Sequence, residues 1–281
     1  MPRTRILILT SLAMLAFAGN SLLCRLALRD TTIDPATFTS VRMLSGAIAL
    51  WLIVRLRTST RVQGGTWLSA LALFAYAAGF SFAYVGLSAG SGALLLFGAV
   101  QTTMILYGLW RGERLDAWQT LGLAIALAGL VVLLLPGITA PPLFSAMLMV
   151  AAGVAWGVYS LRGKGAGDPL AATAGNFLRS LPFAIALSLA FLSMARVDAG
   201  GIAYAIASGA LTSGVGYAIW YTALPGLRAT SAATVQLSVP VIVAAGGVLL
   251  LAEPITLRLL AASVAVLGGI ALVVIRPKPV A

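Results

Sequence analysis

The sequence holds few groups that could carry acid–base or nucleophilic chemistry. Its 281 residues include 18 Lys and Arg, seven Asp and Glu, one cysteine and no histidine. Histidine is the commonest general base and metal ligand in proteins, so a Ser–His pair and a histidine-bound zinc ion are excluded. The sequence also lacks the Gly-x-x-x-x-Gly-Lys loop that cradles nucleotide phosphates. We therefore expect no enzyme activity, no bound metal and no cofactor.

The seven acidic residues all fall between long apolar segments or at their ends. They are Asp30, Asp34, Glu113, Asp116, Asp168, Asp198 and Glu253. Carriers driven by protons or Na⁺ usually keep an ionisable group inside the membrane. We therefore expect facilitative transport, or exchange without a buried acid relay. Glu113 and Glu253 each precede an apolar segment, and we interpret them as stabilising the N-terminus of the helix that follows.

Aromatic side chains recur at helical spacing and could line a binding cavity. The candidates are Tyr76, Phe80, Tyr84, Trp156, Tyr159, Tyr217, Trp220 and Tyr221. The first three are four residues apart and should share one helix face. Anchoring at the membrane interface explains aromatic residues near segment ends, but not Trp156, which lies near the middle of its segment. A pocket of aromatic and a few polar groups suits a small amphipathic molecule.

Amides and arginines inside apolar segments are the second group of candidates. They are Asn20, Gln101, Asn176, Gln236, Arg42 and Arg179. Such amides bond either to another helix or to the amino or carboxylate group of a substrate. An embedded arginine must snorkel, pair or face a cavity. Arg42 lies near the end of its segment and can snorkel. Arg179 lies deeper and joins Asn20, Gln101 and Gln236 as a candidate substrate ligand, unless both arginines only tie helices together.

Glycine and proline mark candidate hinges at Gly79, Gly216 and Pro240. Glycines inside helices permit close packing. The ring of Pro240 clashes with the carbonyl of Gln236 and leaves it without its helical partner, so we expect a break beside this amide. Pro182 and Pro240 predict kinks, and bending there could open one end of a cavity.

The elements that must position these residues are long and apolar. The chain is 60% hydrophobic and 9% charged, with a mean hydropathy of +1.03, whereas about a quarter of the residues of a soluble domain are charged. About 20 apolar residues cross a bilayer. Ten segments qualify: 5–28, 36–57, 66–87, 91–110, 117–136, 143–163, 169–192, 200–222, 229–251 and 256–275. We predict an all-α membrane protein in a lipid bilayer.

The basic residues predict the orientation. The net charge of +11 is dispersed around apolar segments, as in membrane loops, and not clustered as in a nucleic-acid-binding surface. With the N-terminus inside, four arginines face outward: Arg25, Arg29, Arg196 and Arg258. The inner side holds Arg3, Arg5, Arg55, Arg57, Arg61, Arg111, Arg114, Arg162, Lys164, Arg228, Arg276 and Lys278. This bias predicts that both termini are inside.

An internal repeat divides the chain into residues 1–137 and 138–281. The matched charged pairs are Arg25 with Arg162 and Arg42 with Arg179, at a shift of 137 positions, and Glu113 with Glu253, at a shift of 140. Charged residues are scarce here, so such matches are informative. Each copy holds five spans, an odd number, and the second copy must enter the membrane from the opposite face. In such 5+5 inverted repeats the substrate site lies between the halves near the midplane.

Several local motifs resemble the EamA type of the drug/metabolite transporter superfamily. They are Gly112-Glu113, Ala252-Glu253, Tyr221-Thr222-Ala223-Leu224, Thr230-Ser231-Ala232-Ala233 and the later Pro240. Together with the ten spans and the repeat, the resemblance covers essentially the whole chain. Within the superfamily the sequence is most similar to bacterial inner-membrane exporters of aromatic amino acids. The resemblance implies export of amino acids or related small metabolites from the inner membrane.

We therefore expect a secondary transporter that exports aromatic or neutral amino acids, or related amphipathic metabolites, by facilitative alternating access. Its partners would be the small-molecule substrate and the bilayer, and a monomer would suffice. Two alternatives stay open. One is a passive channel, which predicts neither saturation nor counterflow. The other is an exporter of drugs or other metabolites that is coupled to a proton gradient.

Overall fold

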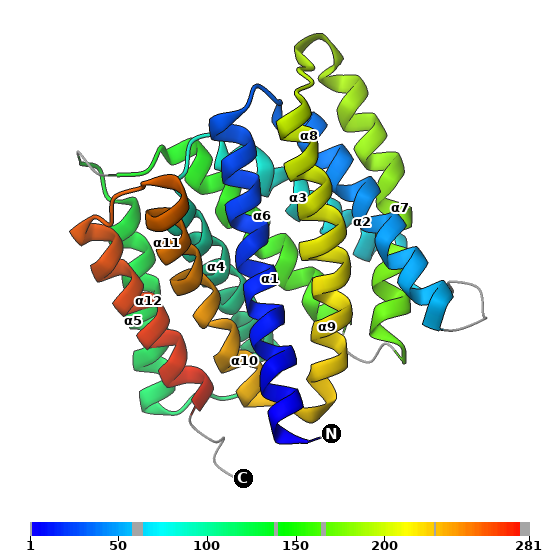
Figure 1. The fold of residues 1–281 in the computed structure, drawn as a ribbon. Helices are drawn as coiled ribbons and strands as arrows, with labels where there is room; N and C mark the ends of the chain where they lie inside the picture. Colours follow the sequence, from blue (N-terminus) through cyan, green and yellow to red (C-terminus); the bar gives the residue numbers. More distant parts are fainter. Residues whose placement is uncertain (1, 58–63, 138–139, 164–166, 228, 276–281) are drawn as a thin grey trace.

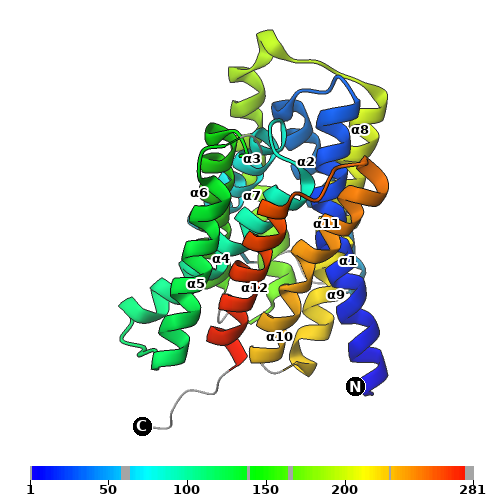
Figure 2. The same ribbon diagram turned by 90° about the vertical axis from the view of Figure 1, so that its left-hand side faces the viewer.

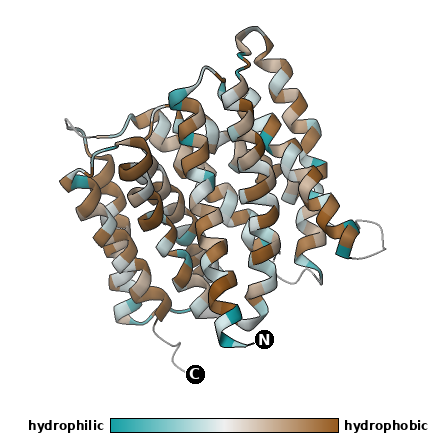
Figure 3. Cartoon of the chain, viewed as in Figure 1, coloured by the Kyte–Doolittle hydropathy of each residue, from teal (hydrophilic) through white to brown (hydrophobic). Residues whose placement is uncertain are grey.

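The computed structural model describes residues 2–57, 64–137, 140–163, 167–227 and 229–275. Within these ranges the chain forms helices and no strands, and ten helical spans are long and apolar enough to cross a membrane. They match the ten predicted segments closely. Many large apolar side chains, among them Leu44, Ile48 and Leu249, are exposed on the outside of the bundle. Hydrophobic residues occur along most of the length of the helices (Figure 3). This surface suits lipid, in which every backbone group must be paired within the protein.

The helices are continuous in the first half and interrupted in the second. The first half comprises α1 (Arg3–Asp30), α2 (Pro35–Arg57), α3 (Trp67–Tyr84), α4 (Ala89–Trp110) and α5 (Ala117–Leu134). The second half begins with α6 (Leu143–Gly163), α7 (Pro169–Ala190) and η1 (Leu192–Met194). Its later spans consist of α8 (Ala199–Ile206), η2 (Ala207–Val215), α9 (Gly216–Ala223), η3 (Leu224–Gly226), α10 (Ala229–Gln236), α11 (Ser238–Leu251) and α12 (Leu257–Ile275).

Four of the acidic residues cap the N-termini of helices. Asp34 accepts hydrogen bonds from two backbone N–H groups at the start of α2. Asp168 does the same for α7, Asp198 caps α8, and Asp116 forms a capping box with Gln119 at the start of α5. A cap satisfies N–H groups that have no partner inside the helix. Capping is therefore the structural reason why these acids stand at the ends of spans.

The two halves pack on one another with matching contacts (Figures 1 and 2). Helix α3 packs against α6, and the eighth span packs in the same way against α1, while α5 packs against α12 and α2 against α7. Gly79 permits the first close contact, at Ala152 on α6, and Gly216 permits the second, at Ala16 on α1. These reciprocal contacts are those of two copies related by inversion across the membrane.

Helix α1 begins and α12 ends at the same end of the bundle (Figure 1). We call it the Arg162 end because α6 finishes there, and we call the opposite end the Arg25 end. The described basic residues keep their predicted sides along the alternating helices. Five that also support the orientation lie outside the described residues: Arg61, Lys164, Arg228, Arg276 and Lys278. That the Arg162 end faces the cytoplasm stays a prediction.

The eighth and ninth spans are the irregular ones. Residues 207–215 form a π-helical segment, a wide turn often found at functional sites. The ninth span ends one helix at Gln236 and begins the next at Ser238, so the predicted break beside Pro240 is confirmed. In the seventh span α7 continues as one helix through Pro182.

Candidate functional site

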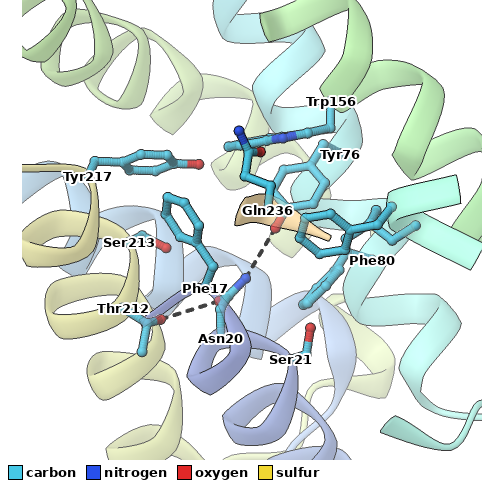
Figure 4. Close-up of a pocket in the computed structure, with 12 residues that line it drawn as sticks. Phe17, Asn20, Ser21, Tyr76, Phe80, Trp156, Thr212, Ser213, Tyr217 and Gln236 are labelled. Atoms are coloured by element: carbon cyan, nitrogen blue, oxygen red, sulfur yellow. Dashed lines mark hydrogen bonds between the residues drawn. The ribbon is translucent and has the colours of Figure 1, made fainter. Parts of the chain in front are cut away.

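A small cavity lies between the two halves, near the middle of the spans that form it (Figure 4). Helices α1, α3 and α4 of the first half and α6, η2, α9 and α10 of the second contribute its lining. The lining residues are Phe17, Asn20, Ser21, Tyr76, Phe80, Leu96, Phe97, Trp156, Thr212, Ser213, Tyr217 and Gln236. Corresponding spans of both repeats therefore meet at one site.

The volume of the cavity is about 40 Å³. This is room for a few water molecules, whereas pockets that hold small organic ligands measure roughly 300–1,000 Å³. The structure therefore shows a closed conformation, and helices must move before an organic molecule can enter.

Asn20 organises the polar side of the cavity (Figure 4). Its Oδ1 accepts a hydrogen bond from the Ser208 hydroxyl at 2.7 Å, and a longer one from Thr212 at 3.5 Å. Its Nδ2 donates to the Tyr76 hydroxyl at 3.1 Å. Ser208 and Thr212 belong to the π-helical segment, so the network joins α1 and α3 of the first half to the eighth span.

Aromatic rings form the opposite side. The ring centroids of Trp156 and Tyr76 are 4.5 Å apart, and Trp156 stacks on Tyr217 at 5.7 Å with an interplanar angle of 23°. Tyr76 also contacts Phe80 at 5.4 Å. Rings at these distances attract one another and present flat apolar surfaces. The cavity therefore offers ring faces on one side and hydrogen-bonding groups on the other.

Arg42 is buried beside the cavity and does not snorkel, which was one of the three possibilities that the sequence left open. Its side chain is only 2% exposed, and its Nη2 donates to the Tyr76 hydroxyl at 3.1 Å. The guanidinium carbon lies 5.2 Å from the ring centroid of Tyr76 and 4.9 Å from that of Phe80. The rings and the hydroxyl thus partly replace the water that a snorkelling arginine would reach. Helix α2 packs against α3, α7 and the eighth span on the side that carries Arg42. The distance of a residue from the end of its span does not reveal this packing.

Arg179, the deeper arginine in the sequence, lies away from the cavity. Its Nη1 donates to the carbonyl of Gly64 at 2.6 Å and to that of Gly175 at 3.1 Å. Gly64 lies in the segment before α3, at the Arg162 end of the bundle. The contacts of Arg179 therefore tie α7 to this segment. This is the structural role that the sequence analysis gave as the alternative to substrate binding.

The structure brings together six of the predicted site residues in the cavity lining: Asn20, Tyr76, Phe80, Trp156, Tyr217 and Gln236. Other aromatic candidates lie behind them. Tyr84 donates to the Ala89 carbonyl at 3.3 Å, Tyr159 donates to Thr173 at 3.2 Å, and Tyr221 stacks on Tyr217. Trp220 packs on Phe17, and Gln101 is buried in α4 outside the lining.

Sequence reasoning missed the other six lining residues: Phe17, Ser21, Leu96, Phe97, Thr212 and Ser213. Phe17 and Ser21 flank Asn20 within one turn of α1, so the neighbours of an embedded amide are a usable signal. Leu96 and Phe97 carry no such signal, because apolar residues surround them on α4. Thr212 and Ser213 lie in the π-helical segment, where adjacent side chains turn toward one cavity.

An ion pair closes the Arg25 end of the bundle. Arg25 Nε lies 2.8 Å from Glu253 Oε1, and both side chains are largely buried. Glu253 Oε2 also accepts the backbone N–H of Ala89 at 2.7 Å, and Arg25 Nη1 donates to the Tyr84 carbonyl at 2.9 Å. Glu253 thus stabilises the N-terminus of α4 through this N–H group. The sequence had predicted that it stabilises the helix that follows it, which is α12.

Hydrogen bonds to neutral acceptors hold the opposite end. Arg162, the repeat counterpart of Arg25, donates to the hydroxyl oxygens of Ser69 at 3.1 Å and Thr66 at 3.3 Å. Asn176 accepts the backbone N–H of Thr66 at 2.9 Å. These contacts join α6 and α7 to the start of α3.

No carboxylate, cysteine or histidine is among the lining residues, and the described part of the chain contains no cluster of such side chains that could hold a metal ion. A closed cavity between inverted halves, in a bundle of ten apolar spans, defines a multi-pass membrane protein with the architecture of secondary transporters.

The chain belongs to the EamA-like transporter family, whose family model matches residues 4–135 and 143–275. It is 60% identical to an uncharacterized protein of Pseudomonas aeruginosa, over 97% of this chain and 96% of that protein. It is 30% identical to an uncharacterized transporter of Archaeoglobus fulgidus, over 68% of this chain and 69% of the relative. A crystal structure 18% identical in sequence matches 98% of each chain with a TM-score of 0.69, a likeness of fold alone.

Proposed function

We propose that this transporter exports aromatic or neutral amino acids, or related small amphipathic metabolites, across the bacterial inner membrane by facilitative alternating access. The observation that carries the proposal is the cavity between the two repeats, with ring faces on one side and the Asn20 network on the other. The rings suit the apolar part of such a substrate, and the polar groups suit its charged end.

Two features support a mechanism in which the two ends of the bundle open in turn. The cavity of about 40 Å³ is too small for an amino acid, so the halves must separate before binding. The eighth span is interrupted by its π-helical segment and the ninth at Leu237, next to the lining residue Gln236. Bending at these two breaks could open one end while the other stays packed.

The composition of the cavity supports a facilitative mechanism. Its twelve lining residues contain amides, hydroxyls and rings but no carboxylate or histidine. Proton-coupled carriers usually place such a titrating group inside the membrane, where its protonation can follow the gradient. The arrangement is therefore suited to flux along the gradient of the substrate itself.

The test is uptake of a radiolabelled amino-acid panel into liposomes that contain the purified protein, with and without a pH gradient. We expect saturable uptake, stimulation by unlabelled substrate on the opposite side, and no effect of the gradient. Uptake driven by the gradient would favour the proton-coupled exporter. Linear uptake without counterflow would favour the channel, and no uptake of any amino acid would reject the assigned substrate class.

A further inference from the structure

The buried guanidinium of Arg42 uses only part of its hydrogen-bonding capacity. Within the described residues Nη2 donates to Tyr76, whereas Nε and Nη1 are buried without a hydrogen-bond partner. A buried charge with unsatisfied donors is unfavourable unless it is compensated. The rings of Tyr76 and Phe80 offer partial compensation, and both also line the cavity. Arg42 therefore places a positive charge just behind one wall of the cavity.

The hydrogen bonds at Tyr76 determine what its hydroxyl can offer a ligand. Arg42 can only donate, so the Tyr76 oxygen accepts the 3.1 Å bond from Nη2. The oxygen also accepts the 3.1 Å bond from Asn20 Nδ2. Two accepted bonds occupy both lone pairs of the oxygen. Its own hydrogen is then available to donate into the cavity.

The rest of the network keeps this direction. In this structure the Asn20 oxygen faces the Ser208 hydroxyl, which donates to it at 2.7 Å, and the Asn20 nitrogen faces Tyr76. Bonds from Ser208 through Asn20 and from Arg42 thus converge on one oxygen. Chains of aligned hydrogen bonds polarise one another, so the Tyr76 O–H becomes a stronger donor.

We infer that the Tyr76 hydroxyl binds the carboxylate of the substrate, and that Arg42 supplies the compensating charge from behind the rings. The inference rests on the proposed function, and it narrows the substrate class to molecules with a carboxylate and an apolar body. The body would lie against Trp156 and Tyr217 on the aromatic side. Because no acidic side chain lines the cavity, a purely cationic molecule finds no opposite charge there and is repelled by Arg42.

The experiment compares ring-matched probes on the full-length protein in nanodiscs by calorimetry. L-Phenylalanine and 3-phenylpropionate carry a carboxylate, and phenylalaninamide replaces it with an amide. We expect both acids to bind at least tenfold more tightly than the amide. Tyr76→Phe keeps the ring and removes the donor, so it should weaken binding of the acids roughly tenfold or more, the usual effect of losing a hydrogen bond to a charged group. The amide, whose neutral carbonyl accepts a weaker hydrogen bond, should lose less affinity.

Tyr107→Phe is the control, because Tyr107 is 41% exposed on α4, packs against Trp110 and is not among the lining residues. It should leave the ratio between acid and amide unchanged. Arg42→Gln should reduce this ratio and Arg42→Lys should partly restore it. If Arg42→Gln does not fold, Tyr76→Phe decides the question alone.

Binding of neither acid to the wild-type protein, equal binding of acid and amide, or an equal loss for all probes in Tyr76→Phe would overturn the inference. Failure of the proposed function is distinguishable from these outcomes. Liposomes without saturable flux would reject the carrier, whereas the probe ratio in nanodiscs still reports the carboxylate site. Saturable flux of a cation but of no carboxylate would reject the carboxylate site and keep the carrier.

Discussion

Arg25 and Arg162 occupy equivalent positions in the two repeats, but they hold the two ends of the bundle differently. Arg25 forms a largely buried ion pair with Glu253, which also receives the N–H group of Ala89 at the start of α4. Arg162 bonds to the hydroxyls of Ser69 and Thr66. The first set joins the two halves by opposite charges, and the second joins them by hydrogen bonds to neutral groups.

The difference shows how one repeated sequence can produce an asymmetric conformation. Inverted copies have the same choice of contacts at both ends, and a carrier alternates because only one end adopts the tighter set at a time. In this conformation the tighter set is at the Arg25 end. Four substitutions test whether the two ends differ in this way.

Glu253→Gln should open the Arg25 end. The substitution removes the ion pair and leaves Arg25 with mostly carbonyl partners. The loss is roughly one charge-assisted hydrogen bond, which should increase the population of the open end about tenfold. Cys24 is fully buried next to Arg25 and is the one cysteine of the chain, so it is a natural reporter. The rate of maleimide labelling at Cys24 should rise about tenfold in nanodiscs. An unchanged rate would show that the ion pair does not hold this end closed.

Pro240→Ala should impair transport severalfold. In the first repeat α4 runs unbroken from Ala89 to Trp110, whereas its counterpart is interrupted at Leu237. Alanine supplies the missing N–H group and permits a continuous helix, which would stiffen the span beside Gln236. The maximal rate of counterflow in liposomes should fall, with little change in substrate affinity. Wild-type rates in this variant would exclude a hinge at this break.

Arg162→Gln should have a smaller effect than the change at Glu253. The two hydrogen bonds go to hydroxyls in exposed or partly buried positions, so each should contribute near the lower end of the usual range, about 0.5 kcal/mol. Together they correspond to a change of about fivefold or less in the transport rate. Labelling of Cys24 at the opposite end should stay at the wild-type rate or fall. Labelling that rises as much as in Glu253→Gln would mean that the two ends open together.

Asp34 should make the Arg25 end sensitive to acid. Partial burial raises the pKa of Asp34, but hydrogen bonds from Thr37, Arg196 and Ala36 outweigh it and lower the pKa below the ordinary value. A lowered pKa stabilises the fold at pH values above that of the unfolded chain, and this stability is lost as the pH falls through the folded pKa. Melting temperature should decrease below about pH 4. In Asp34→Asn the melting temperature should decrease less at acid pH than in the wild type. An equal decrease in both proteins would assign the effect to other carboxylates.

Local signals in the sequence predicted the spans well, because length and hydropathy are properties of a continuous segment. The ion pair at the Arg25 end was not predicted, although Arg25 and Glu253 were both singled out by the repeat. Their pairing depends on how α1 packs beside the connection between α11 and α12. Only the tertiary arrangement supplies this information.

The rotation of each helix was the main unknown in the candidate site. Tyr76 and Phe80 were placed correctly on one face, since their spacing fixes their relation to each other. The surroundings of Arg42 were left open, because nearly every face of α2 is apolar and the sequence does not show which side meets other helices. Thr212 was missed because the π-helical segment departs from the regular period.

The position of Arg42 also affects the insulation of the membrane when no substrate is bound. Any leak through a carrier would dissipate a proton or voltage gradient across its membrane. A fixed positive charge beside the cavity repels hydronium and metal cations, as arginines do in water-conducting pores that exclude protons. The same guanidinium that we assign to substrate recognition would therefore keep the empty carrier electrically tight.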